Sequence, residues 1–161
     1  LGLTMGMQPI VGYNFGAQKI DRVKQTLKLG IVSGVVITSS GFFICELFPH
    51  AVSAIFTDSD HLIDLAVDGL RITVIMFPFV GAQIVIGNFF QSIGKAKISI
   101  FLSLTRQLLY LLPCLLLFPN WWGLKGIWIS MPVSDALAFI TAVVSLIIYI
   151  KKVSKQHPIA E

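Results

Sequence analysis

Long apolar runs, separated by short charged segments, divide the chain into pieces of membrane length. Four of these runs have the roughly 20 residues that an α-helix needs to cross a bilayer: residues 29–48, 72–90, 98–118 and 127–150. A shorter apolar stretch at residues 1–16 precedes them. Because a chain crosses hydrocarbon only as helices or as a closed barrel, the pattern predicts an all-α, polytopic membrane helix bundle in one domain.

The basic residues are divided unevenly among the segments that connect the runs. Nine lie in the first loop, in the loop after residues 72–90 and in the tail 151–161, whereas two lie in the remaining connections. Lys and Arg accumulate on the cytoplasmic side of membrane proteins. We therefore predict that the first loop, the Gly94 loop and the C-terminal tail are cytoplasmic, and that the acidic segment 49–71 faces the opposite side.

The chain opens inside an apolar stretch, without an initiator methionine or a basic leader. That stretch contains about 13 apolar residues, fewer than a full membrane span requires. We expect the chain to be the C-terminal piece of a longer protein, whose missing N-terminal portion is its first partner after the bilayer.

Composition narrows the possible functions. With 55% hydrophobic and 12% charged residues, the chain is far more apolar than a soluble domain. Its net charge of +4 comes from clusters between apolar runs, so we predict no nucleic-acid partner. Cys45 and Cys114 lie inside apolar runs, and we find no nucleophile or metal-ligand motif. We therefore predict neither an enzyme nor a metal site.

Two charged residues lie deep inside apolar runs. Asp135 follows Pro132 by about one turn, and a carboxylate in that position is costly and by default a functional-site candidate. The alternative is a structural carboxylate that is hydrogen-bonded to a neighbouring helix. Counting about 1.5 Å per residue from the ends of the runs places Arg106 and Asp135 about 10 Å apart in depth. We therefore predict that Arg106 binds carbonyls or other inward-facing polar groups rather than Asp135.

The run 72–90 contains polar residues that lipid would not tolerate unpaired. Pro78 should bend this helix, and Gln83 and Asn88 should then point inward. They are candidates for a cavity wall, with a kinked packing helix as the alternative. In the first stretch, Gln8 and Asn14 are candidates for the same reason. Further candidate kinks lie at Pro9, Pro113 and Pro132.

Several short motifs resemble one family of membrane transporters. The order of these motifs, more than any single one, resembles the second half of multidrug and toxic compound extrusion (MATE) transporters. The motifs are Gln8-Pro9-Ile10, Gly12-Tyr13-Asn14, Gly16-Ala17, Phe89-Phe90-Gln91 before Gly94-Lys95, Arg106-Gln107, Pro113, Gly123 to Trp128, and Pro132 with Asp135.

The resemblance implies a fold and a function. The fold would be the C-terminal six-helix lobe of a transporter, truncated at its start, in the bacterial inner membrane with a cytoplasmic C-terminus. The function would be export of small organic cations, including drugs, in exchange for Na⁺ or H⁺ by alternating access, with no other cofactor. Residues 8–17 would form a gating corner, the helix with Pro78 and Gln83 would line the cavity, and Asp135 would be an ion or cavity site.

Part of the family carries an acidic residue in the helix that corresponds to residues 72–90, and this chain has none there. The sequence therefore does not determine whether the coupling ion is Na⁺ or H⁺. Two alternatives also remain. A lipid-linked oligosaccharide flippase of the same superfamily would be expected to line its cavity with more basic residues than Arg106 alone. A non-transporting assembly subunit would not explain Asp135, Arg106 and the prolines inside the runs.

Overall fold

The computed structural model describes residues 2–156, with side chains to residue 153. Every element within this range is helical, which confirms the all-α prediction. The elements are α1 (Gly2–Gly16), α2 (Ile20–Leu47), α3 (Pro49–Ala54), α4 (Asp60–Val74), α5 (Phe77–Ser92), α6 (Ala96–Leu104), the π-helical η1 (Thr105–Leu111), α7 (Leu112–Trp122) and α8 (Leu124–Gln156). The last part of the predicted tail, residues 157–161, lies outside the described residues.

The described helices include several of membrane-spanning length. Three continuous stretches are long and apolar enough to cross a bilayer, namely Ile20–Leu47, Ala96–Trp122 and Leu124–Val153. The second of these joins α6, η1 and α7. A fourth candidate consists of α4 and α5, which meet at an angle of 51°. Pro78 lies in the first turn of α5, directly after this break, where its missing N–H costs no helical hydrogen bond.

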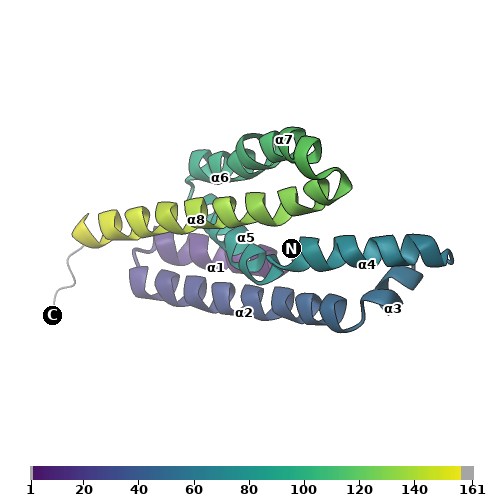
Figure 1. The fold of residues 1–161 in the computed structure, drawn as a ribbon. Coiled ribbons are helices and arrows are strands. Elements are labelled where there is room, and N and C mark those ends of the chain that lie inside the picture. The colour runs from purple at the N-terminus through teal and green to yellow at the C-terminus, as the bar shows by residue number, and fades with distance from the viewer. Residues whose placement is uncertain (1, 157–161) are drawn as a thin grey trace.

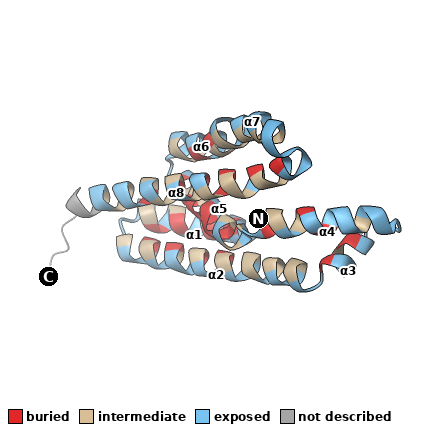
Figure 2. Cartoon of the chain, in the orientation of Figure 1, coloured by how far each residue is buried: buried red, intermediate tan, exposed pale blue. Residues whose placement is uncertain are grey.

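The helices lie roughly along one direction (Figure 1). In this view α8 runs between the α6–α7 layer above it and α1, α5 and α2 below it, and contacts between elements link α8 to both sides. The buried apolar core lies toward the end where α1 and α5 end and α2 begins, and it includes Val11, Leu27, Phe89, Phe90 and Leu146. Buried residues concentrate on α1, α5 and α8, whereas α6 and α7 are largely exposed (Figure 2).

Helices α2 and α5 cross in close contact. A methyl group on Gly81 would overlap the backbone of Gly34, and one on Gly34 would lie 3.1 Å from the carbonyl oxygen of Gly81. The hydroxyl of Thr38, one turn further along α2, donates to the carbonyl of Gly34 at 2.9 Å. Small residues of this kind are what allow membrane helices to pack backbone against backbone.

A tight turn joins α7 to α8. Gly123 has φ 56° and ψ −134°, a backbone conformation that is essentially restricted to glycine. Just beyond it, Gly126 lies directly against the backbone of Phe118, where a methyl group would overlap the Phe118 carbonyl. This contact fixes how far α7 and α8 slide along each other, and therefore sets the level at which their polar residues meet.

Candidate functional site

Asp135 lies in the interior of α8 and is 7% exposed. The helix continues through Pro132, one turn before it, and the neighbouring hydroxyls bind within the helix itself. Ser134 donates to the carbonyl of Met131 at 2.8 Å, and Ser130 donates to that of Gly126 at 2.8 Å. These serines therefore take no part in pairing Asp135, whose charge needs a partner from another helix.

Arg106 provides that partner. Its Nε donates to Oδ1 of Asp135 at 2.7 Å, a charge-assisted hydrogen bond between η1 and α8. The side chain of Asp135 is 9% exposed and that of Arg106 is 35% exposed. The prediction that Arg106 binds other polar groups in preference to Asp135 is therefore wrong.

The error has a physical cause. Depths counted from the ends of the apolar runs that lie away from the Gly123 turn do not take the register of the two helices into account. The register of the two helices is set instead by the turn at Gly123 and by the contact between Gly126 and Phe118. Counted from that contact at about 1.5 Å per residue, Arg106 and Asp135 lie within about 5 Å of the same level. An arginine side chain spans that difference.

The segment that carries Arg106 is π-helical. Within Thr105–Leu111 the backbone winds more widely than in an α-helix, and the N–H of Leu112 donates to the carbonyl of Gln107, five residues back. Pro113 follows at once and has no N–H with which to continue an α-helical ladder. Single-turn π segments of this kind are frequent at functional sites.

A second polar contact joins the same two helices. The hydroxyls of Tyr110 and Thr141 lie 2.8 Å apart, and that of Thr141 also reaches the carbonyl of Leu137 at 2.8 Å. One turn later, Ser145 donates to the carbonyl of Thr141. Thr141 and Ser145 thus add polar groups to α8 between Asp135 and its C-terminal end. Nothing in the sequence pattern pairs Tyr110 with Thr141.

The candidates on α5, Gln83 and Asn88, lie apart from this pair, and Gln83 is buried in the interior of the bundle. Gln83 is 8% exposed, and its Oε1 has no hydrogen-bond partner among the described residues. The hydroxyl of Thr105, which lies on η1 next to Arg106, also has no hydrogen-bond partner among the described residues, and Thr105 is 3% exposed. Asn88 is half-buried and donates to the carbonyl of Ile84 in its own helix. Unpaired acceptors in an apolar interior are costly, so Gln83 and Thr105 are places where a bound water or another donor is expected.

The candidates on α1 are divided between the surface and the interior. Gln8 and Pro9 are exposed. Asn14 is 8% exposed and donates to the carbonyl of Ile10 at 2.8 Å. Of all the candidate binding residues, the structure brings only Arg106 and Asp135 into direct contact.

Comparison with known proteins gives the family. The sequence profile of the MatE family matches residues 1–116. This chain belongs to the MatE family. Its members are multi-pass membrane transporters that handle small organic substrates, and the resemblance drawn from the sequence motifs is confirmed.

The chain is similar to bacterial multidrug export proteins. It is 25% identical over 151 residues to the multidrug export protein MepA of Staphylococcus aureus strain MSSA476, and 24% identical over 137 residues to that of Staphylococcus haemolyticus. The alignments cover 93% and 85% of this chain, but 32% and 30% of the relatives. The chain thus spans about a third of the length of these proteins.

Solved structures give the same result for the fold. The MATE multidrug transporter DinF-BH in complex with R6G superimposes with a TM-score of 0.85 at 39% identity, over 90% of this chain and 32% of that one. An inward-facing MATE family transporter of the MOP superfamily superimposes with a TM-score of 0.89 at 20% identity, over 96% and 36%. The prediction of a MATE-like helix bundle is confirmed.

Proposed function

We propose that this chain forms part of a secondary active antiporter that exports organic cations, including drugs, in exchange for Na⁺ or H⁺. Membership of the MatE family supports the transport function. The similarity to MepA, a multidrug export protein, and to DinF-BH in complex with R6G supports a broad, organic substrate class.

The observation that carries the proposal is the pair of Arg106 and Asp135. A carboxylate that is 7% exposed, inside a membrane-length helix, is retained at high cost and marks an ion or substrate pathway by default. Its partner arginine is 35% exposed and lies on a π-helical segment, a winding that is frequent at functional sites. We infer that Asp135 has a cationic partner that is able to leave it.

Exchange of that partner links two fluxes. In one state Asp135 holds Arg106; in another it holds a proton, a metal cation or the ammonium group of a substrate. A carboxylate that binds the coupling ion and the substrate in turn couples their transport. Each bound cation shifts the conformational equilibrium by the difference between its affinities for the two states. Gln83, with its unpaired Oε1, is a further candidate for contact with a transported molecule.

The fold similarity supports alternating access by movement of the lobe as a unit. The chain superimposes on an inward-facing and on an outward-facing conformation with TM-scores of 0.89 and 0.87. Both identities lie near 20%, so this argument rests on the fold alone. The basic loops and tail support a cytoplasmic C-terminus in a bacterial inner membrane.

Arg106 gives the flippase alternative little support, because it is paired with Asp135. A flippase of that kind would be expected to line its cavity with more basic residues that meet pyrophosphate. The assembly-subunit alternative still predicts that Asp135 has no function beyond stability.

The experiment is dye efflux from cells that express the complete transporter containing this chain. The unaltered protein and the Asp135→Asn variant are compared under an imposed Na⁺ gradient and an imposed H⁺ gradient, at matched expression in the membrane. We expect one gradient to drive export of a lipophilic cation and the variant to be inactive. Export under neither gradient would contradict the proposal, and a fully active variant would leave Asp135 with a structural role.

A further inference from the structure

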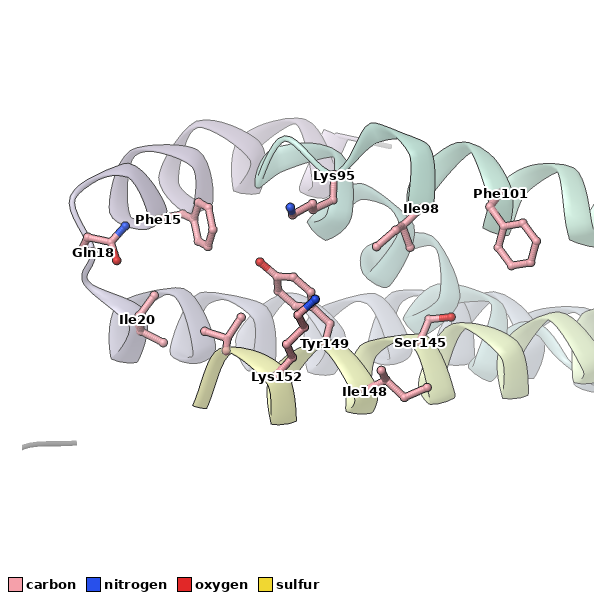
Figure 3. Close-up of a pocket in the computed structure, with 11 residues that line it drawn as sticks. Phe15, Gln18, Ile20, Lys95, Ile98, Phe101, Ser145, Ile148, Tyr149 and Lys152 are labelled. Carbon is pink, nitrogen blue, oxygen red and sulfur yellow. The ribbon is translucent and has the colours of Figure 1, made fainter. Parts of the chain in front are cut away.

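A cavity of about 620 Å³ lies away from the Arg106–Asp135 pair, where the end of α1, the start of α6 and the end of α8 come together (Figure 3). Its polar lining comes from two turns and one helix end: Gln18 after α1, Lys95 before α6, and Ser145, Tyr149 and Lys152 on α8. Neither the pair nor the proposed transport function uses this cavity.

The polar groups in the cavity are suited to an anion. The amino groups of Lys95 and Lys152 and the hydroxyl of Tyr149 point toward the same space (Figure 3). The ring of Tyr149 is held from behind by Phe89 and Phe90, with centroids 6.3 and 5.5 Å away, so its hydroxyl is directed into the cavity. Among the described lining residues there is no carboxylate to neutralise the lysines.

The turn that presents Gln18 is conformationally unusual. Gln18 has φ 59°, the one positive φ among the described non-glycine residues, and it lines the cavity. A residue with a side chain adopts this conformation only at some cost, so the surrounding structure must hold it there. The result is that an amide lies at the rim of a basic cavity.

The remaining walls are apolar and exposed. Phe101 and Ile148 line the cavity and are 53% and 61% exposed, and Ile98 lies beside Phe101 on α6, across the cavity from Ile148 (Figure 3). Phe101 lies on the stretch Ala96–Trp122 and Ile148 on Leu124–Val153, which are both long and apolar enough to cross a bilayer, where this exposed apolar surface would lie beside lipid chains. The cavity therefore combines a basic end and an apolar side wall.

We propose that this cavity binds the phosphodiester headgroup of an anionic membrane phospholipid, with the acyl chains along Ile98, Phe101 and Ile148. Lys95 lies in the Gly94 loop and Lys152 in the segment 151–161, which the distribution of Lys and Arg predicts on the cytoplasmic side, where anionic lipids are held by basic residues. A free phosphate would use the same lysines but would gain nothing from the apolar wall. The two ligands are therefore distinguishable.

The experiment uses the complete transporter, purified in detergent, and titrates it with phosphatidylglycerol, phosphatidylcholine or inorganic phosphate while bound lipid is counted by native mass spectrometry. The test variant is Lys95→Ala/Lys152→Ala. Its matched control is Lys97→Ala/Lys151→Ala, which removes the same charge from neighbouring positions outside the cavity. A third variant, Tyr149→Phe, removes only the hydroxyl.

We expect phosphatidylglycerol to bind with a defined stoichiometry, and phosphatidylcholine and phosphate to bind far more weakly. The test variant should lose roughly thirtyfold in affinity, since each lysine near an anionic lipid contributes about fivefold. The control should keep its affinity, and Tyr149→Phe should lose a fewfold.

Three results would overturn the proposal. Equal losses in the test and control variants would assign binding to diffuse surface charge. Equal effects of inorganic phosphate and phosphatidylglycerol would assign the site to a free anion. Absence of lipid binding in the unaltered protein would mean that another part of the transporter fills the cavity. If the double variant fails to fold, Tyr149→Phe at unchanged lipid affinity would also count against the site.

Discussion

The two sides of this lobe are held together by different kinds of contact. Where α2 crosses α5, Gly34 and Gly81 bring the backbones together. The hydroxyl of Thr38 donates to Gly34 in its own helix at 2.9 Å and makes one long contact, at 3.5 Å, to the carbonyl of Pro78 on α5. Where η1 meets α8, the contact includes an ion pair and a hydroxyl pair, and the segment opposite α8 is π-helical. The first contact is based mainly on shape and the second on polar groups.

The difference shows which part of the lobe is able to change. A glycine crossing has one packed arrangement, because any displacement opens a gap that lipid cannot fill well. Polar groups, in contrast, keep their energy when they exchange one partner for another. We infer that the α2–α5 side is the fixed part and that the α8 layer is the part that responds to ions or substrate.

The largest expected effect on stability comes from removing Arg106, the more exposed member of the ion pair. Arg106→Ala leaves a carboxylate that is 9% exposed without its partner, and this should cost about 3 kcal/mol of stability. Asp135→Asn should cost less, about 1 kcal/mol, because the 35% exposed arginine turns to water or headgroups. Thermal unfolding of the purified complete protein measures both, and equal costs would contradict the asymmetry.

The next largest effect on stability is expected where α2 crosses α5. Gly81→Ala places a methyl group against the Gly34 backbone and should cost about 2 kcal/mol, because neither backbone is free to move. Gly87→Ala is the matched control on the same helix, since nothing lies within 4 Å of its added methyl group. The control should be neutral or slightly stabilising. If the two variants unfolded alike, the crossing would not be as close as the structure has it.

The smallest effect on stability is expected at the Tyr110–Thr141 contact between η1 and α8. Tyr110→Phe removes one hydroxyl from the contact with Thr141, which keeps its own bond to Leu137. Hydrogen bonds between membrane helices contribute about 0.6 kcal/mol on average, and a loss of that size is expected in unfolding. A loss as large as that of Arg106→Ala would mean that the hydroxyl pair, and not the ion pair, holds the layer together.

Much of the fold is readable from hydrophobicity alone, whereas the site is not. Apolar length predicts long helices in these runs, although the run 72–90 crosses the break between α4 and α5. Pro78 predicts a bend close to that break, because it is a local property of the chain. The pairing of Arg106 with Asp135 depends on the register of two antiparallel helices, which Gly123 and Gly126 determine. Counting from that turn would have found the pair.

Other features leave a weaker trace in the sequence. The π-helical winding at Thr105–Leu111 is hinted at only by Pro113, since a proline by itself predicts a kink as readily as a π segment. The basic cavity brings together Lys95, in the turn before α6, and Lys152, near the end of α8, which the sequence pattern shows only as members of two charge clusters. Such convergence is a property of tertiary packing.

The central claim, that Asp135 takes part in transport and does more than hold two helices together, is tested most directly by Arg106→Gln/Asp135→Asn. This double variant replaces the ion pair with an uncharged amide pair. Gradient-driven dye efflux and thermal unfolding are measured on the same complete protein. The account predicts near-normal stability without efflux. Efflux at the unaltered rate would contradict it and would reduce the pair to a structural contact.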